Sequence, residues 1–175
     1  MSFLSSLKLA QSKNNSLLCV GLDPDISRIP WGRDNVVDFL KNVIDETHDL
    51  VCSYKPQIAY FASYGGESDL IEVIDYIHTN YPEIPVILDA KRGDIGSTAE
   101  QYAREAFERY RADAVTVNPY MWGDTIEPYL AYEGKWVIVL CKTSNPGSGD
   151  FENLVLANGR KLYEEVAERA CENWS

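Results

Sequence analysis

The residues best suited to chemistry are Asp89, Lys91 and Asp94, which lie in the segment 86–98, VILDAKRGDIGST. The segment begins as a short apolar run, which predicts a buried strand, and then passes through charged residues and two glycines. Because residues two apart on a strand share a face, Asp89 and Lys91 should point the same way, with Asp94 following in the turn. Two carboxylates stabilise the ammonium form of a neighbouring lysine, so this arrangement predicts a proton donor held beside fixed negative charge.

The same residues also have a purely structural interpretation, as an ion pair that closes the end of a strand. For an isolated D-x-K-x-x-D pattern this interpretation is the more common one, since structural ion pairs form without any function. A cell-adhesion role for the tripeptide 92–94 is a further alternative. Three residues match often by chance, however, and the first residues of the chain do not resemble a secretory signal.

Composition and charge indicate a globular protein, with 175 residues, a net charge of −11 and 45% hydrophobic residues. This length predicts one domain over residues 1–175. The acidic balance argues against binding to nucleic acid or to an anionic membrane, and no apolar run approaches the ~18 residues of a membrane span. The four cysteines lie far apart in the sequence, so free thiols and a cytoplasmic location are expected.

Apolar runs and amphipathic segments alternate along the chain. Strands are predicted at residues 17–22, 51–58, 85–91, 114–118 and 136–142, and helices at residues 34–50, 67–81, 98–110, 125–132 and 159–171. This alternation indicates an α/β fold in which helices cover a parallel sheet. Neither a Walker loop nor a G-x-G-x-x-G motif follows any of the predicted strands.

Polar side chains recur where the predicted strands end. They are Asp23, Lys55, Asp89 with Lys91, Asn118 and Ser144. A site assembled from several strand ends is typical of a (β/α)₈ (TIM) barrel, and a Rossmann-type sheet is the alternative. A complete barrel needs eight strands and typically ~250 residues. Since five strands are predicted here, we expect this chain to hold strands 1–5 and to lack strands 6–8, unless it pairs with another chain.

Five motifs in order resemble the orotidine 5′-phosphate decarboxylases, in the bacterial subgroup with the sequence D-A-K-R-G-D-I-G. They are LLCVGLDPD at 17–25, YKPQIAYF at 54–61, LDAKRGDIGSTAEQYA at 88–103, DAVTVNPYMWGD at 113–124 and KTSNPGS at 142–148. The resemblance implies a homodimeric TIM barrel that converts orotidine 5′-phosphate to UMP and CO₂ in pyrimidine biosynthesis. It also implies shared active sites at the subunit interface and no metal or organic cofactor.

The resemblance further implies roles for individual residues. The positions that match the catalytic tetrad of the family are Lys55, Asp89, Lys91 and Asp94. Lys91 is expected to stabilise and then protonate the carbanion that forms at C6 of the pyrimidine when CO₂ leaves. Asp94 matches the aspartate that reaches into the partner subunit's site, and Thr98 would accompany it there.

Substrate binding is implied for three positions. Asp23 and Lys55 match residues that contact the ribose, and Ser144 matches the loop serine that recognises the pyrimidine edge. The glycine-rich turn and the arginine that hold the 5′-phosphate in the family have no counterpart after Cys171. A truncated, catalytically inactive half-barrel is therefore one alternative. The metal-dependent 3-keto-gulonate-phosphate decarboxylase group is another; it shares the D-x-K-x-x-D strand but lacks the S-N-P-G loop at 144–147.

Overall fold

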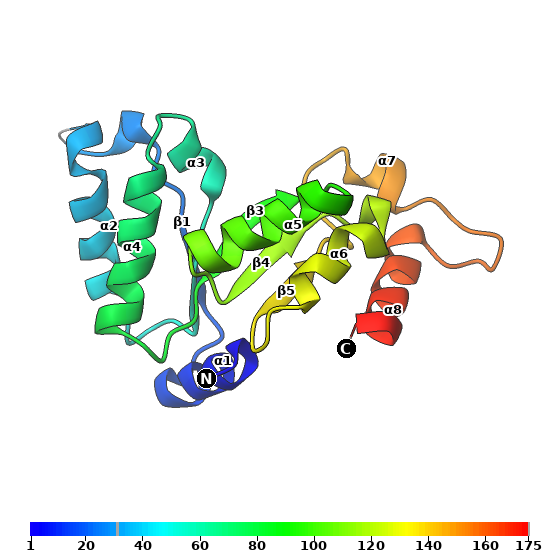
Figure 1. Cartoon of the computed structure of the whole chain (residues 1–175), viewed down its shortest axis with the longest axis horizontal. Coiled ribbons are helices and arrows are strands. Elements are labelled where there is room, and N and C mark those ends of the chain that lie inside the picture. Colours follow the sequence, from blue (N-terminus) through cyan, green and yellow to red (C-terminus); the bar gives the residue numbers. More distant parts are fainter. Residues whose placement is uncertain (31, 175) are drawn as a thin grey trace.

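The computed structural model describes residues 1–30 and 32–174, which form five parallel strands surrounded by helices (Figure 1). The strands are β1 (Cys19–Leu22), β2 (Ser53–Pro56), β3 (Ile87–Arg92), β4 (Ala114–Val117) and β5 (Trp136–Val139). The longer helices are α1 (Phe3–Asn14), α2 (Val36–Asp45), α4 (Glu67–Asn80), α5 (Gly96–Arg104), α6 (Gly123–Leu130) and α8 (Leu162–Trp174). The short helical segments are η1 (Ile26–Arg28), η2 (Arg33–Asn35), α3 (Ile58–Ala62), the π-helical η3 (Glu105–Arg109), η4 (Pro119–Met121) and α7 (Ser148–Glu152).

The strands are neighbours in the same order in which they follow one another along the chain. β1 pairs with β2, and β3 pairs with β4, which pairs with β5. Parallel bridges from Tyr54 to Val86 and from Gln57 to Asp89 connect β2 to β3. A Rossmann sheet places later strands on both sides of the first, whereas a barrel wall keeps the sequential order seen here. The Rossmann alternative is therefore wrong for the described residues.

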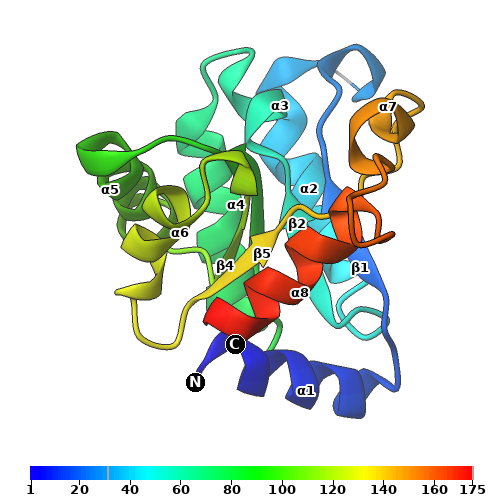
Figure 2. The same ribbon diagram turned by 90° about the vertical axis from the view of Figure 1, so that its right-hand side faces the viewer.

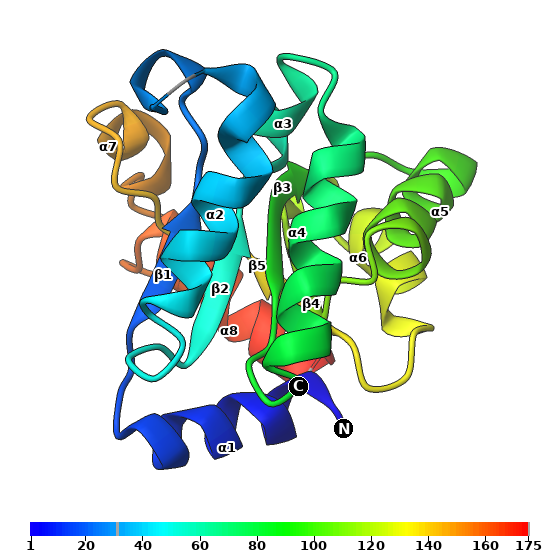
Figure 3. The same ribbon diagram turned by 90° about the vertical axis from the view of Figure 1, so that its left-hand side faces the viewer.

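Helices α2 and α4 cover the outer face of the first strands and lie side by side (Figure 3). Four apolar residues of α4, at the 3–4 spacing of one helical face, are fully buried: Leu70, Val73, Ile74 and Ile77. They join a core to which β2, β3 and β4 contribute Tyr54, Leu88, Val115 and Val117. Removing this apolar surface from water provides the main driving force for holding the strand ends in place.

Helix α1 lies across the end of the molecule at which the strands begin (Figures 1 and 2). Its first residue, Phe3, packs in a small cluster with Ile87 and Ala114. At its other end, the Asn14 amide donates hydrogen bonds to the carbonyl oxygens of His48 and Val51, at 2.8 and 2.7 Å. Helix α1 therefore covers the end of the sheet opposite the carboxyl ends of the strands.

The outermost strands are less buried than their apolar sequences predicted. All four residues of β4 are buried, but Trp136 in β5 is 42% exposed and Cys19 in β1 is also exposed. Within the described residues, β1 pairs only with β2 and β5 only with β4, so each has one free edge. None of the described helices is long and apolar enough to cross a membrane.

Candidate active site

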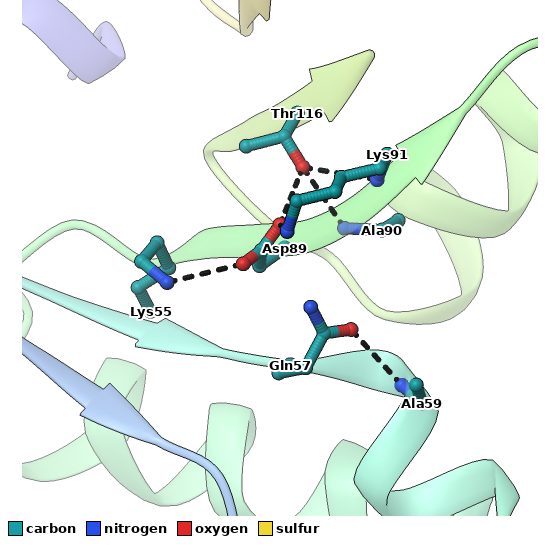
Figure 4. A network of polar contacts seen from close by, with 7 residues as sticks. All are labelled: Lys55, Gln57, Ala59, Asp89, Ala90, Lys91 and Thr116. Atoms are coloured by element: carbon teal, nitrogen blue, oxygen red, sulfur yellow. Dashed lines mark hydrogen bonds and ion pairs between the residues drawn. The ribbon is translucent and has the colours of Figure 1, made fainter. Parts of the chain in front are cut away.

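Asp89, near the carboxyl end of β3, is the centre of the candidate site. It is the only charged residue among the buried described residues, with 6% of its surface exposed. Its Oδ2 accepts a hydrogen bond from Lys55 Nζ at 3.1 Å, and its Oδ1 accepts one from Lys91 Nζ at 2.6 Å (Figure 4). The two lysines come from adjacent strands, β2 and β3. A buried carboxylate therefore lies between two ammonium groups, which offset the free-energy cost of its desolvation.

Thr116, on β4, provides a third contact to this carboxylate. Its hydroxyl donates to Asp89 Oδ1 at 2.8 Å. Burial by itself would raise the pKa of Asp89, but the hydrogen bonds from Lys91, Thr116 and Lys55 outweigh it and hold the pKa below its usual value. Asp89 is therefore ionised at neutral pH. We call Lys55, Asp89 and Lys91 the lysine–aspartate cluster.

Lys91 reaches Asp89 from an unusual backbone conformation. Its φ is +47°, in the left-handed region that side-chain-bearing residues rarely adopt. The pairing of β3 with β4 is irregular at this point, because Leu88 pairs with Val115 and Arg92 with Val117. The extra residues of β3 form a bulge, a feature that re-aims side chains next to active sites.

Asp23 follows β1 directly and lies within electrostatic reach of the cluster. It is exposed, but the chain around it partly desolvates the carboxylate, which raises its pKa. The negative charge of Asp89 acts in the same direction, whereas Lys55 and Lys91 oppose it. The ends of β1, β2 and β3 thus bring four predicted site residues to one end of the sheet: Asp23, Lys55, Asp89 and Lys91.

Asp94 and Thr98 follow the cluster in the sequence, between the end of β3 and the first turn of α5. Asp94 is half-buried between β3 and α5, where its Oδ1 accepts a hydrogen bond from the amide of Ile95 at 2.8 Å. Thr98 is exposed in the first turn of α5. Within the described ranges, no hydrogen bond or ion pair joins Asp94 to any member of the cluster. The structure thus assembles three of the four tetrad candidates.

Ser144 lies in an exposed loop after β5 that is held by Glu152 of α7. The Glu152 carboxylate accepts hydrogen bonds from the Thr143 hydroxyl at 2.6 Å, the Thr143 amide at 3.0 Å and Lys142 Nζ at 2.9 Å. These bonds lower the pKa of Glu152 to about 2. In the described part of the chain, no hydrogen bond connects Ser144 to the lysine–aspartate cluster.

Sequence reasoning did not identify Thr116 as a site residue. A signal was present, because Thr116 is the one polar residue in the apolar strand AVTV, and it is 6% exposed. A buried hydroxyl needs a partner, which points to a polar group inside the fold. Among the described residues, no group of three or more His, Cys, Asp or Glu side chains could hold a metal ion.

Comparisons with known proteins place this geometry in a family. Residues 16–174 match the family described as "Orotidine 5'-phosphate decarboxylase / HUMPS family". The orotidine 5′-phosphate decarboxylases of Dechloromonas aromatica and Azoarcus sp. are 59% and 57% identical over 179 aligned residues, covering 100% of this chain and 66% of each relative. The chain thus spans slightly less than two thirds of the length of these curated relatives.

A solved structure gives the same result for the fold. The structure of Leishmania donovani OMP decarboxylase is similar with a TM-score of 0.89 and 43% identity, covering 99% of this chain and 66% of that one. This likeness confirms the predicted TIM-barrel fold class, of which the described residues form five strands. With the family match over nearly all of its length, the chain belongs to the orotidine 5′-phosphate decarboxylase / HUMPS family.

Proposed function

We propose that the protein to which this chain belongs converts orotidine 5′-phosphate to UMP and CO₂ in pyrimidine biosynthesis. The observation that carries the proposal is the lysine–aspartate cluster, in which Lys91 Nζ lies 2.6 Å from the ionised and buried Asp89. Loss of CO₂ leaves an sp² carbanion at C6 of the pyrimidine, with no adjacent π system to delocalise the charge. Fixed positive charge in a preorganised site is the remaining means of stabilising it.

Lys91 supplies this charge and then the proton. Its ammonium group stabilises the developing carbanion at C6 and transfers a proton to it, so the product is neutral at that carbon. Asp89 holds the Lys91 ammonium in place before the substrate binds, and Lys55 shares the same carboxylate from the other side. With two lysines on one carboxylate, the cluster keeps net positive charge for an anionic substrate.

The substrate-binding roles fall to Asp23 and Ser144, which are exposed, and to Lys55, which is half-buried. Asp23 and Lys55 bind the ribose hydroxyls, and Ser144 hydrogen-bonds the edge of the pyrimidine. Exposure of Asp23 and Ser144 supports this assignment, since both side chains are open to a ligand. The attachment of the Ser144 loop to Glu152 supports a defined position for it.

The active form in this proposal is a homodimer with shared sites, in which Asp94 and Thr98 act in the partner's site. Support comes from the lack, among the described residues, of a hydrogen bond or ion pair between Asp94 and the lysine–aspartate cluster of its own chain, and from the exposure of Thr98. Residues 1–175 are proposed to belong to one barrel domain, since one large core joins Leu22 to Tyr129. A cytoplasmic location is proposed from the free cysteines.

The competing function within the family is that of the metal-dependent 3-keto-gulonate-phosphate decarboxylases. The S-N-P-G sequence at 144–147 favours the pyrimidine substrate. The test is to express the protein from its own gene, supply each substrate with and without EDTA, and measure UMP or CO₂. UMP formation that EDTA does not affect is expected. Release of CO₂ from 3-keto-gulonate phosphate alone, abolished by EDTA, would contradict the proposal.

A further inference from the structure

The bulge in β3 leaves backbone amides without strand partners. Three consecutive residues, Asp89, Ala90 and Lys91, stand opposite the single residue Thr116 of β4. In a regular parallel ladder, the amides of Ala90 and Lys91 would alternate between the two neighbouring strands. Here both amides donate instead to the Thr116 hydroxyl oxygen, each at 3.0 Å (Figure 4). One side-chain oxygen thus replaces the ladder partners at the bulge.

Counting donors and acceptors then determines where the hydroxyl proton goes. A threonine hydroxyl has one proton to donate and two lone pairs to accept with. The amides of Ala90 and Lys91 occupy both lone pairs, so the proton is free for one acceptor, Asp89 Oδ1 at 2.8 Å. An ordinary hydroxyl can rotate so that it either donates to a neighbour or accepts from it. Because the two amides occupy its lone pairs, the Thr116 hydroxyl can only donate to Asp89.

We propose that Thr116 is a positioning residue of the lysine–aspartate cluster. Its hydroxyl stabilises the bulge that gives Lys91 its direction, and the same bonds force it to donate its only proton to Asp89. The inference rests on the proposed function for its effect on the reaction, but its structural part does not. The Thr116 hydroxyl oxygen accepts from the Lys91 amide and its proton goes to the Asp89 carboxylate. The position of Lys91 is therefore coupled to the ionised state of Asp89.

The first test compares Thr116→Val, which keeps the side-chain shape but removes the hydroxyl, with Thr116→Ser, which keeps the hydroxyl. In the protein expressed from its own gene, the valine variant should lose about 10²-fold in kcat. Without the Thr116 hydroxyl the Lys91 ammonium should shift by about 1 Å, and a misplacement of that size costs about 10²-fold. KM should change less, since the cluster acts on the transition state. The acid limb of the kcat/KM profile should move to higher pH, because Asp89 loses a donor to its charged form.

Thr116→Ser should stay within about tenfold of the wild type and keep the wild-type acid limb, since the same three bonds can form. The control is Thr47→Val, which removes a half-buried threonine hydroxyl in the turn after α2; it donates to the Val43 carbonyl at 2.6 Å and contacts the Tyr54 hydroxyl at 2.8 Å. This control should change neither kcat nor the pH profile. A valine variant with wild-type kcat, or one whose only change is in KM, would overturn the inference.

The second test needs neither activity nor a variant. Amide hydrogen exchange by NMR in the wild-type protein should show protection at Ala90 and Lys91, although the strand ladder is interrupted there. Fast exchange at both amides would overturn the inference even if Thr116→Val did not fold. If the wild type makes no UMP but both amides are protected, the proposed function fails while the structural role of Thr116 stands.

Discussion

Asp113, just before β4, makes a contact whose loss should be measurable as a change in stability. Its Oδ2 accepts hydrogen bonds from the Val86 amide at 2.9 Å and from His78 Nε2 at 3.0 Å, and its Oδ1 lies 3.2 Å from Lys135 Nζ. One carboxylate thus ties together the start of β3, the last turn of α4 and the residue before β5. We predict that Asp113→Ala lowers the free energy of unfolding substantially.

The size of this effect follows from the three contacts. Val86 is fully buried, so its amide would lose a partner that water cannot replace, at about 1–3 kcal/mol. The contacts of Asp113 with His78 and Lys135 involve side chains that are about a quarter exposed, and we assign them ~0.5 kcal/mol each after solvent screening. The expected loss is therefore about 2–4 kcal/mol. Asp113→Asn keeps an oxygen for Val86 and should lose only about 1 kcal/mol.

The effect should also depend on pH. Burial would raise the pKa of Asp113, but the bonds from His78 and the Val86 amide outweigh it and lower the pKa. A carboxyl with a lowered pKa in the folded state stabilises the protein above its unfolded-state pKa, and the stabilisation is lost as pH falls through the folded-state value. The difference between the wild type and Asp113→Asn should therefore be largest near neutral pH and shrink below about pH 4.

Urea denaturation followed by circular dichroism measures these differences in the protein expressed from its own gene. Asp49→Ala is the matched control, since this aspartate is exposed, and it should change the free energy of unfolding by less than about 0.5 kcal/mol. An Asp113→Ala variant as stable as that control would refute the reasoning. If the difference in free energy of unfolding between the wild type and Asp113→Asn stays constant down to pH 3, the argument from the lowered pKa is refuted.

Three further predictions concern the proposed active site. Mixing Asp94→Ala with Lys91→Ala protein should restore activity, because a mixed dimer holds one intact site; no recovery after verified subunit exchange would place Asp94 in its own chain's site. Ser144→Ala should lower both kcat/KM and selectivity for the pyrimidine, and unchanged values would assign this serine to loop structure alone. Because β1 and β5 each have a free edge within the described residues, we expect a polypeptide of residues 1–175 to be at least ~10⁴-fold less active than a complete barrel; growth of a decarboxylase-deficient strain without uracil on this polypeptide would contradict that.

The five strands could be predicted because they depend on the local pattern of apolar residues. Each of the five predicted strands overlaps one observed strand. The charged residues and glycine at 89–94 indicated where the third strand ends. The positions of helix and strand ends were less predictable. The predicted strand 136–142 ends at Val139, and the predicted helix 159–171 begins at Leu162. These limits depend on which neighbours complete the backbone hydrogen bonds.

The conformation of Lys91 could not be predicted from its own segment. The expectation that Asp89 and Lys91 share a face assumed a regular strand, but the structure brings them together across a bulge. At that bulge the Lys91 amide donates to the hydroxyl of Thr116, which is 25 residues away in the sequence. Likewise, nothing in the segment 89–94 indicates that the Asp94 carboxylate accepts a hydrogen bond from the Ile95 amide, while Asp89 is held by the two lysines.

The most direct test of the central proposal is the rate of UMP formation by Lys91→Ala. The proposal assigns to Lys91 both the charge that stabilises the carbanion and the proton that neutralises it, so kcat should fall by several orders of magnitude. Lys8→Ala, which removes an exposed lysine of α1 at the opposite end of the strands, should keep wild-type activity. Circular dichroism checks that both variants fold. A folded Lys91→Ala protein with activity within about tenfold of the wild type would contradict the proposal.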